Sequence, residues 1–310
     1  MKDYVEYEIN RKISNKTLIL DYLIKLDIPG FKKENNKTYV LSPIEQDSKT
    51  WFNEFCVFVF KNLGKKFVPI IRLSDGEYEF LLGNKAPVYD QKYLSFFKNY
   101  IIFLYKKLFK KNSFSARTLP SVSSGNYSIK EIKNIIPSIE KNLKFLSKHG
   151  IFAFHLTYGE KQFQERFHHP LKLYLDSLKI NINSKNYFPF YFVYAILMGP
   201  FSEKLFKNRN ILVVHSATGN KKKIISDTLF KKGVRKITWE TISSSKSLSD
   251  KIIIEKSLKL DFVLIGAGVG KLNQVISLST LKVPLIDAGF CFEVWANKSN
   301  SSLRPMMTPN

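Results

Sequence analysis

The stretch Val68-Pro69-Ile70-Ile71-Arg72-Leu73-Ser74-Asp75-Gly76-Glu77 joins an apolar strand to a glycine-containing turn. The residues that follow, Tyr78-Glu79-Phe80-Leu81-Leu82, have the pattern of a short helix. Strand ends that lead into helix starts are the places where α/β sheets bind ligands. The stretch therefore predicts an α/β fold with a functional site at the carboxyl end of this strand.

The turn contains two carboxylates that are separated only by Gly76. Asp75 and Glu77 can both reach one divalent cation, whose open coordination positions would bind phosphate oxygens. Arg72 would add a planar fork of donors for the same phosphates. The alternative is an ordinary strand-to-turn junction, because Ser, Asp and Gly are common turn formers and acidic residues favour helix starts. The residues alone leave both interpretations open.

The chain of 310 residues is long enough for one large domain or two modest ones. Its formal net charge of +23 suggests an anionic partner such as nucleic acid, a lipid surface or a phosphorylated substrate. However, Lys, Asn, Ile and Phe are abundant together, as nucleotide bias in an AT-rich genome would produce without selection for binding. Nucleic acid is an unlikely partner, because the basic residues are spread out and no aromatic-plus-basic motif accompanies them.

The cysteines and the chain start indicate the compartment. Cys56 and Cys291 lie among apolar neighbours and cannot form a disulfide framework, so we expect both to be buried in a reducing compartment. The first residues lack the apolar core of a signal peptide, which predicts a cytoplasmic protein. The apolar stretch 187–201 contains two prolines and a glycine, and it is shorter than the roughly 20 residues that span a bilayer. It is predicted to be buried.

Strands and helices alternate along most of the chain. We expect an N-terminal extension (1–45) with a short strand at 38–41, a first α/β half (46–205) and a second, Rossmann-like half (206–310). Predicted helices are 50–63, 100–111 and 129–149. The second has amphipathic spacing, and Pro137 would kink or divide the third. Predicted strands after the opening stretch are 150–155, 211–215, 236–239, 262–265 and 283–286. This spacing predicts parallel pairing with right-handed crossovers.

Two loops of the second half are candidate phosphate sites. Ser216, Thr218 and Gly219 lie between a strand and a helix start, where free NH groups favour an anion and Lys221–Lys223 add positive charge. We expect one of the two loops to contact a nucleotide.

The second loop, Gly266-Ala267-Gly268-Val269-Gly270-Lys271, follows a later strand, and its three glycines would let a ligand approach the backbone closely. The third glycine comes one residue too early for Gly-x-Gly-x-x-Gly, and the spacing of a P-loop is missing. The alternative is a close turn that needs glycine for packing.

Asp287 ends the last predicted strand, where it would orient a sugar hydroxyl, act as a base or cap a turn. His155 and Glu240 are further candidates for a catalytic base, and Arg117 is a lesser candidate for a substrate contact.

Arg72-Leu73-Ser74-Asp75-Gly76-Glu77 resembles the Arg-x-Gly-Asp-Gly-Glu string of bacterial GT-D fold glycosyltransferases. The segments 262–268 and Ile286-Asp287-Ala288-Gly289 are similar to the closing strands of that family, so the resemblance spans residues 50–295. It implies a Rossmann-like, GT-D-like fold and sugar transfer from a nucleotide-sugar donor with Mn²⁺ or Mg²⁺. Asp75 and Glu77 match the family's metal and diphosphate motif, Arg72 matches its preceding basic residue, and Ser74 replaces the usual Gly.

The resemblance leads us to expect a metal-dependent glycosyltransferase that builds a surface polysaccharide or glycoconjugate. Its acceptor would be a glycan or a lipid-linked glycan, and the basic surface suits peripheral contact with an anionic inner membrane face. The alternative function is non-catalytic binding of a nucleotide or phospho-sugar, with Asp75-Gly76-Glu77 as a turn.

Overall fold

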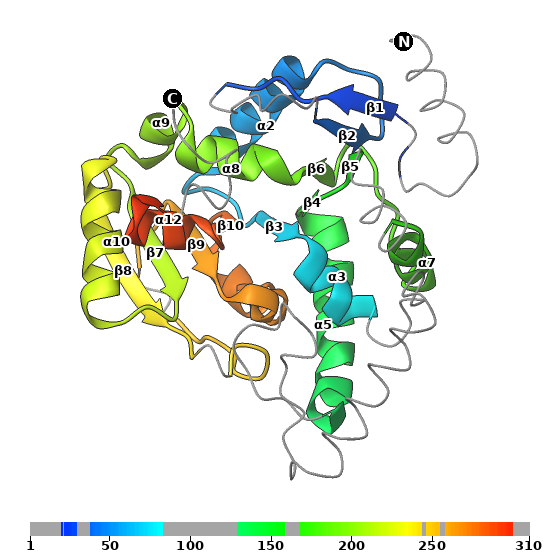
Figure 1. The fold of residues 1–310 in the computed structure, drawn as a ribbon. Coiled ribbons are helices and arrows are strands. Elements are labelled where there is room, and N and C mark those ends of the chain that lie inside the picture. The colour runs from blue at the N-terminus through cyan, green and yellow to red at the C-terminus, as the bar shows by residue number, and fades with distance from the viewer. Residues whose placement is uncertain are drawn as a thin grey trace.

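The computed structural model describes residues 20, 22–29, 38–82, 129–158, 168–243, 246–254 and 258–299. Its centre is a seven-stranded parallel sheet with the order β6-β4-β3-β10-β9-β7-β8 (Figure 1). In chain order the strands are β3 (Pro69–Leu73), β4 (Ile151–Phe154), β6 (Tyr187–Pro189), β7 (Asn210–His215), β8 (Lys236–Thr241), β9 (Phe262–Gly266) and β10 (Leu285–Asp287). The predicted α/β class with a parallel sheet is confirmed.

The helices form two groups, one on each side of the sheet (Figure 1). One group contains α3 (Asp75–Leu82), α5 (Ile129–His149), α7 (His169–Ser177), η4 (Gly268–Gly270), α11 (Lys271–Gln274) and η5 (Ser277–Leu281). The other contains α2 (Ser48–Asn62), α8 (Phe190–Met198), α9 (Ser202–Phe206), α10 (Gly219–Lys231) and α12 (Cys291–Ala296). Right-handed crossovers produce this division, because β3→β4 and β9→β10 move one way along the sheet while β7→β8 moves the other.

α5 is a single helix although Pro137 lies inside it, so the expected division does not occur. Proline costs one backbone hydrogen bond and crowds the preceding turn. Ile139, Leu143 and Leu146 form a buried stripe after the proline, and this apolar contact keeps the helix continuous.

The N-terminal segment belongs to a second, antiparallel sheet with the order β1-β2-β5. Its strands are β1 (Tyr22–Lys25), β2 (Tyr39–Ser42) and β5 (Thr157–Tyr158), which confirms the short strand predicted near residue 39. The Tyr187 hydroxyl donates to the Leu41 carbonyl at 2.8 Å, so this sheet is tied to β6 of the main sheet. The segment therefore packs on the first α/β half.

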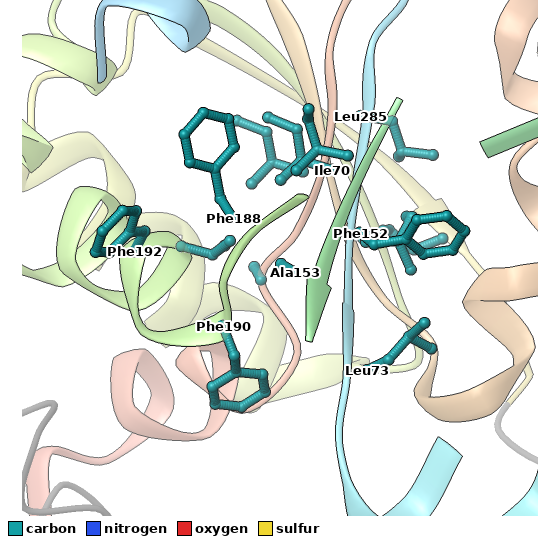
Figure 2. Packing of buried hydrophobic residues seen from close by; sticks show 14 of the residues in the cluster. Ile70, Leu73, Phe152, Ala153, Phe188, Phe190, Phe192 and Leu285 are labelled. Atoms are coloured by element: carbon teal, nitrogen blue, oxygen red, sulfur yellow. The ribbon is translucent and has the colours of Figure 1, made fainter. Parts of the chain in front are cut away.

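Aromatic side chains dominate the core between α2, α8 and the sheet. Figure 2 shows Phe188 and Phe192 on one side of the strands and Phe152 on the other. Trp51 of α2 contacts Phe192 edge-on with ring centroids 5.2 Å apart. All nine residues of α8 are buried, which confirms the burial predicted for this apolar stretch.

Both cysteines are free and buried, as expected. None of the helices in the described ranges combines the length and the apolar character needed to cross a bilayer. The helix predicted at 100–111 and the candidate Arg117 lie outside the described residues.

Candidate functional site

The carboxyl ends of neighbouring strands form the candidate site. β3 ends at Leu73, β10 at Asp287, β9 at Gly266 and β7 at His215, and these four strands are adjacent in the sheet. The connections after β3 and β9 lead to one face, whereas α12 after β10 and α10 after β7 lie on the other. Open α/β sheets typically bind ligands outside the carboxyl ends of the strands where adjacent connections diverge in this way.

Arg72 and Asp287 form a buried ion pair between β3 and β10. The guanidinium Nη2 lies 3.2 Å from Asp287 Oδ1, and Nε donates to the Asp287 carbonyl at 2.8 Å. The Arg72 backbone NH also donates to Asp287 Oδ2 at 3.2 Å. The guanidinium carbon lies 4.2 Å from the centre of the Tyr194 ring, a cation–π contact. A Cβ at Gly289, where φ is +40°, would overlap Arg72 Nη2, so glycine is required there.

Asp287 has no exposed surface. Burial alone would raise the pKa of this carboxyl, but Arg72 and Lys271 outweigh burial and hold the pKa below its usual range. A carboxylate that is fully buried, paired with two cations and lowered in pKa is suited to positioning those cations. Its catalytic role stays a prediction.

Lys271 connects the two carboxylates of the site. Its ammonium Nζ lies 2.7 Å from Glu77 Oε1 and 2.7 Å from Asp287 Oδ2. Lys271 is only 4% exposed, and lysine is almost never buried this deeply unless it is paired. Because Lys271 is the first residue of α11, this contact joins the glycine turn after β9 to α3 after β3. The result is a buried chain of alternating charges in the order Arg72, Asp287, Lys271, Glu77.

The second carboxylate oxygen of Glu77 stabilises the start of α3. Glu77 Oε2 accepts a hydrogen bond from the backbone NH of Ser74 at 3.0 Å. In a Ser-x-x-Glu capping box, the glutamate at the third helical position makes this contact with the N-cap residue. Asp75 is the first residue of α3, and its side chain lies outside the described part of the structure. Glu77 therefore has a structural function that the strand-to-turn interpretation anticipated.

The described side chains do not fit a divalent cation as they stand. Both oxygens of Glu77 are occupied, one by the Ser74 NH and the other by the Lys271 ammonium. No three His, Cys, Asp or Glu side chains gather in a metal-binding arrangement within the described ranges. A cation on Glu77 Oε1 would have to share that oxygen with Lys271, and the two positive charges would repel each other.

The predicted glycines have two different roles. A Cβ at Gly266 would lie 2.5 Å from the Phe292 ring, and a Cβ at Gly270 would lie 2.5 Å from the Ser247 backbone, so these two glycines are needed for packing. Gly268 and Gly219 have positive φ values of 53° and 52°, and nothing lies within 4 Å of a Cβ at either position. Open space therefore faces the backbone at Gly268 and Gly219.

The first loop is held by His215. Its ring packs on Phe292 with centroids 4.4 Å apart, and its Nδ1 accepts the Ala217 NH at 3.0 Å. Burial lowers the pKa of His215 to about 4, so the ring stays neutral and accepts this hydrogen bond near neutral pH. Ser216 is half-buried and Thr218, the residue before α10, is exposed.

Of the other candidate bases, the structure places only His155 beside the Arg72 to Glu77 segment. His155 Nδ1 lies 3.2 Å from the Ser74 hydroxyl, and its Nε2 lies 2.9 Å from the Tyr191 hydroxyl. Glu240 is on β8 at the far edge of the sheet, with β7, β9 and β10 between it and β3. It does not join the site.

Sequence reasoning did not select Lys271 as a site residue. The signal was a lysine directly after a glycine-rich turn, but its carboxylate partners are 194 positions before it and 16 positions after it in the chain. Only the pairing of β10 with both β3 and β9 brings the three residues together.

No protein-family model matches the chain, and no curated protein is similar to it in sequence. Three solved structures match. One, described as a new glycosyltransferase (DUF1792) from Streptococcus sanguinis, is 12% identical, with 81% of this chain and 83% of that chain covered at a TM-score of 0.45.

A second solved structure, of the domain of unknown function 1792, is described as having a distinct glycosyltransferase fold. It is 12% identical over 82% of this chain and 85% of that chain, with a TM-score of 0.43. A selenomethionine structure of the same domain is 13% identical over 81% of this chain and 86% of that chain, also with a TM-score of 0.43. Two of these three structures are thus described as a glycosyltransferase or as having a glycosyltransferase fold.

Proposed function

We propose that this protein is a glycosyltransferase that takes a sugar from a nucleotide-sugar donor. The observation that carries the proposal is the buried set of Arg72, Asp287, Lys271 and Glu77 at the carboxyl ends of β3, β10 and β9. Fixed positive groups at such an edge stabilise the negative charge that builds on a leaving nucleoside diphosphate. The open backbone at Gly268 lies in the turn directly before Lys271.

The acceptor in this proposal is a glycan or a lipid-linked glycan for a surface polysaccharide or glycoconjugate. The high positive charge of the chain supports contact with a lipid diphosphate at an anionic membrane face. Co-sedimentation with vesicles tests this part. Binding should rise with the fraction of anionic lipid and fall with added salt, whereas equal binding to neutral vesicles would remove the membrane contact from the proposal.

The sequence pattern also predicts Mn²⁺ or Mg²⁺ at Asp75 and Glu77. Bound there, a divalent cation would neutralise phosphate oxygens of the donor. The Ser74 NH and the Lys271 ammonium already contact the two oxygens of Glu77, so both would compete with a cation for this carboxylate. The requirement for a metal ion is therefore tested by comparing donor binding and sugar transfer with and without chelator.

The second candidate function is binding of a nucleotide or phospho-sugar without transfer. The capping contact between Glu77 and Ser74 favours it, because this contact gives Glu77 a structural role at the start of α3.

The deciding experiment incubates the full chain with a panel of nucleotide sugars, with Mn²⁺ or with chelator. It measures both the thermal stability of the protein and the release of nucleoside diphosphate in the presence of glycan acceptors. Stabilisation by one donor together with acceptor-dependent release supports the transferase. Stabilisation without release under any condition supports the binding protein. No stabilisation by any nucleotide would contradict the transferase and nucleotide binding, and would leave phospho-sugar binding.

A further inference from the structure

The ammonium of Lys271 contacts Glu77, one of the two residues to which the sequence pattern assigns a divalent cation. It lies 2.7 Å from Oε1 of Glu77. It also lies 2.7 Å from Oδ2 of Asp287, and only 5% of its side chain is exposed. Moving this ammonium away would break two close ion pairs in a water-poor environment, where ion pairs are strong.

One backbone position in the turn before Lys271 faces open space. Gly266 and Gly270 are packed against other residues, but Gly268, three residues before the lysine, faces open space with φ at 53°. An ammonium has three N–H donors, and its contacts within the described ranges are made to one oxygen of each carboxylate. These two contacts account for two of the three N–H donors, and the open turn lies at the same edge of the sheet.

We propose that Lys271 is the built-in cation of the donor site, and that it binds the diphosphate of the nucleotide in place of a divalent metal ion. This inference rests on the proposed function, since it concerns the diphosphate that a nucleotide-sugar donor and a released nucleoside diphosphate share. Glu77 and Asp287 hold the ammonium in place, and Arg72 balances the second carboxylate. With Lys271 fixed in this way, diphosphate binding does not depend on Mn²⁺ or Mg²⁺.

The test measures binding of a panel of nucleoside diphosphates to the full chain by isothermal titration calorimetry, in EDTA and in Mn²⁺. For the wild-type protein we expect dissociation constants that agree within about twofold between the two conditions. Lys271→Met should weaken binding at least tenfold, whereas Lys271→Arg should restore part of the loss. The matched control is Lys172→Met, which removes the ammonium of an exposed Lys172–Asp176 pair on α7 and should change nothing.

Glu77→Gln provides a second variant in case Lys271→Met does not fold. It keeps oxygen and nitrogen atoms at the same place but removes the charge that a metal ion needs. Because Glu77 helps to hold the ammonium, Glu77→Gln should weaken nucleoside diphosphate binding. If Lys271 is the cation, the loss should be the same in EDTA and in Mn²⁺.

Binding that requires Mn²⁺ or Mg²⁺ and disappears in Glu77→Gln would overturn the inference, while the proposed function would stand with a metal cofactor. Wild-type affinity of a folded Lys271→Met variant would also overturn it. If no nucleoside diphosphate binds the wild-type protein under either condition, the proposed function fails and this inference fails with it.

Discussion

Substitution of Asp287 by Asn tests the central ion-pair arrangement most directly. The change keeps the size of the side chain but removes the single negative charge that lies between Arg72 and Lys271. An amide also places an NH₂ group where an acceptor oxygen faced a donor. Two buried cations would then lie close together with one carboxylate, that of Glu77, left to balance them.

The expected loss follows from the burial of the pair. Removing one partner of a buried ion pair costs about 3–5 kcal/mol, since the remaining charge has no compensation. For a protein of this size, each kcal/mol corresponds to roughly 2–4 °C in the melting temperature. Asp287→Asn should therefore lower the melting temperature by about 10 °C. The matched control, Asp176→Asn, breaks the exposed pair with Lys172 and should lower stability by less than about 1 kcal/mol.

The pH dependence gives an independent measurement of the same arrangement. The folded pKa of Asp287 lies below its unfolded value, so the unfolded chain takes up the proton first as the pH falls. The stabilisation is therefore complete above the unfolded pKa of about 3.9 and is lost as the pH falls through the folded pKa. Denaturant titrations of the wild type and Asp287→Asn should differ at neutral pH and converge in acid.

Lys271→Met in the Asp287→Asn background removes the extra positive charge. The double variant should lose less stability than the two single losses added together, because the two residues interact directly. Equal stability of Asp287→Asn and Asp176→Asn at neutral pH would refute the reasoning, as would strict additivity in the double variant.

Three further predictions concern the loops and the core. Gly270→Ala should lower the melting temperature more than Gly268→Ala, because a Cβ at Gly270 meets the Ser247 backbone at 2.5 Å while Gly268 faces open space. At Gly268 the expected loss of stability comes only from the left-handed backbone and is about 1–2 kcal/mol. The folded pKa of His215 is about 4, below the unfolded value near 6.5. Its contribution to the free energy of unfolding, about 3 kcal/mol, should therefore be complete above pH 6.5 and decrease toward pH 4. Denaturant titrations should show that His215→Asn removes this pH dependence. Phe192→Ala should cost about 3–5 kcal/mol by thermal unfolding, since its ring is fully buried against the aromatic residues of α2, and a loss below 1 kcal/mol would contradict the described core.

Local sequence patterns predicted the strands of the main sheet closely, except for β6 (Tyr187–Pro189), which lies in the stretch that was expected only to be buried. The run Phe262-Val263-Leu264-Ile265 has apolar residues at consecutive positions, as a strand covered on both faces requires, and the structure places β9 there. The alternation of such runs with helices also determined the parallel pairing. A short helix after the turn was also expected, but its start at Asp75 and the capping box of Ser74 and Glu77 were found only in the structure.

Long-range pairing decided what the candidate site contains. Sequence pointed to Asp75 and Glu77 as one motif and to Asp287 separately. Only the insertion of β10 between β3 and β9 sets Asp287 against Arg72 and Lys271. The glycine-rich turn looked uniform in sequence, whereas the structure separates two packing glycines from the open Gly268. Periodicity and turn chemistry act over a few residues and are therefore written in the sequence itself. Which charges neutralise each other depends on the order of the strands, and that order is fixed only when the whole core packs.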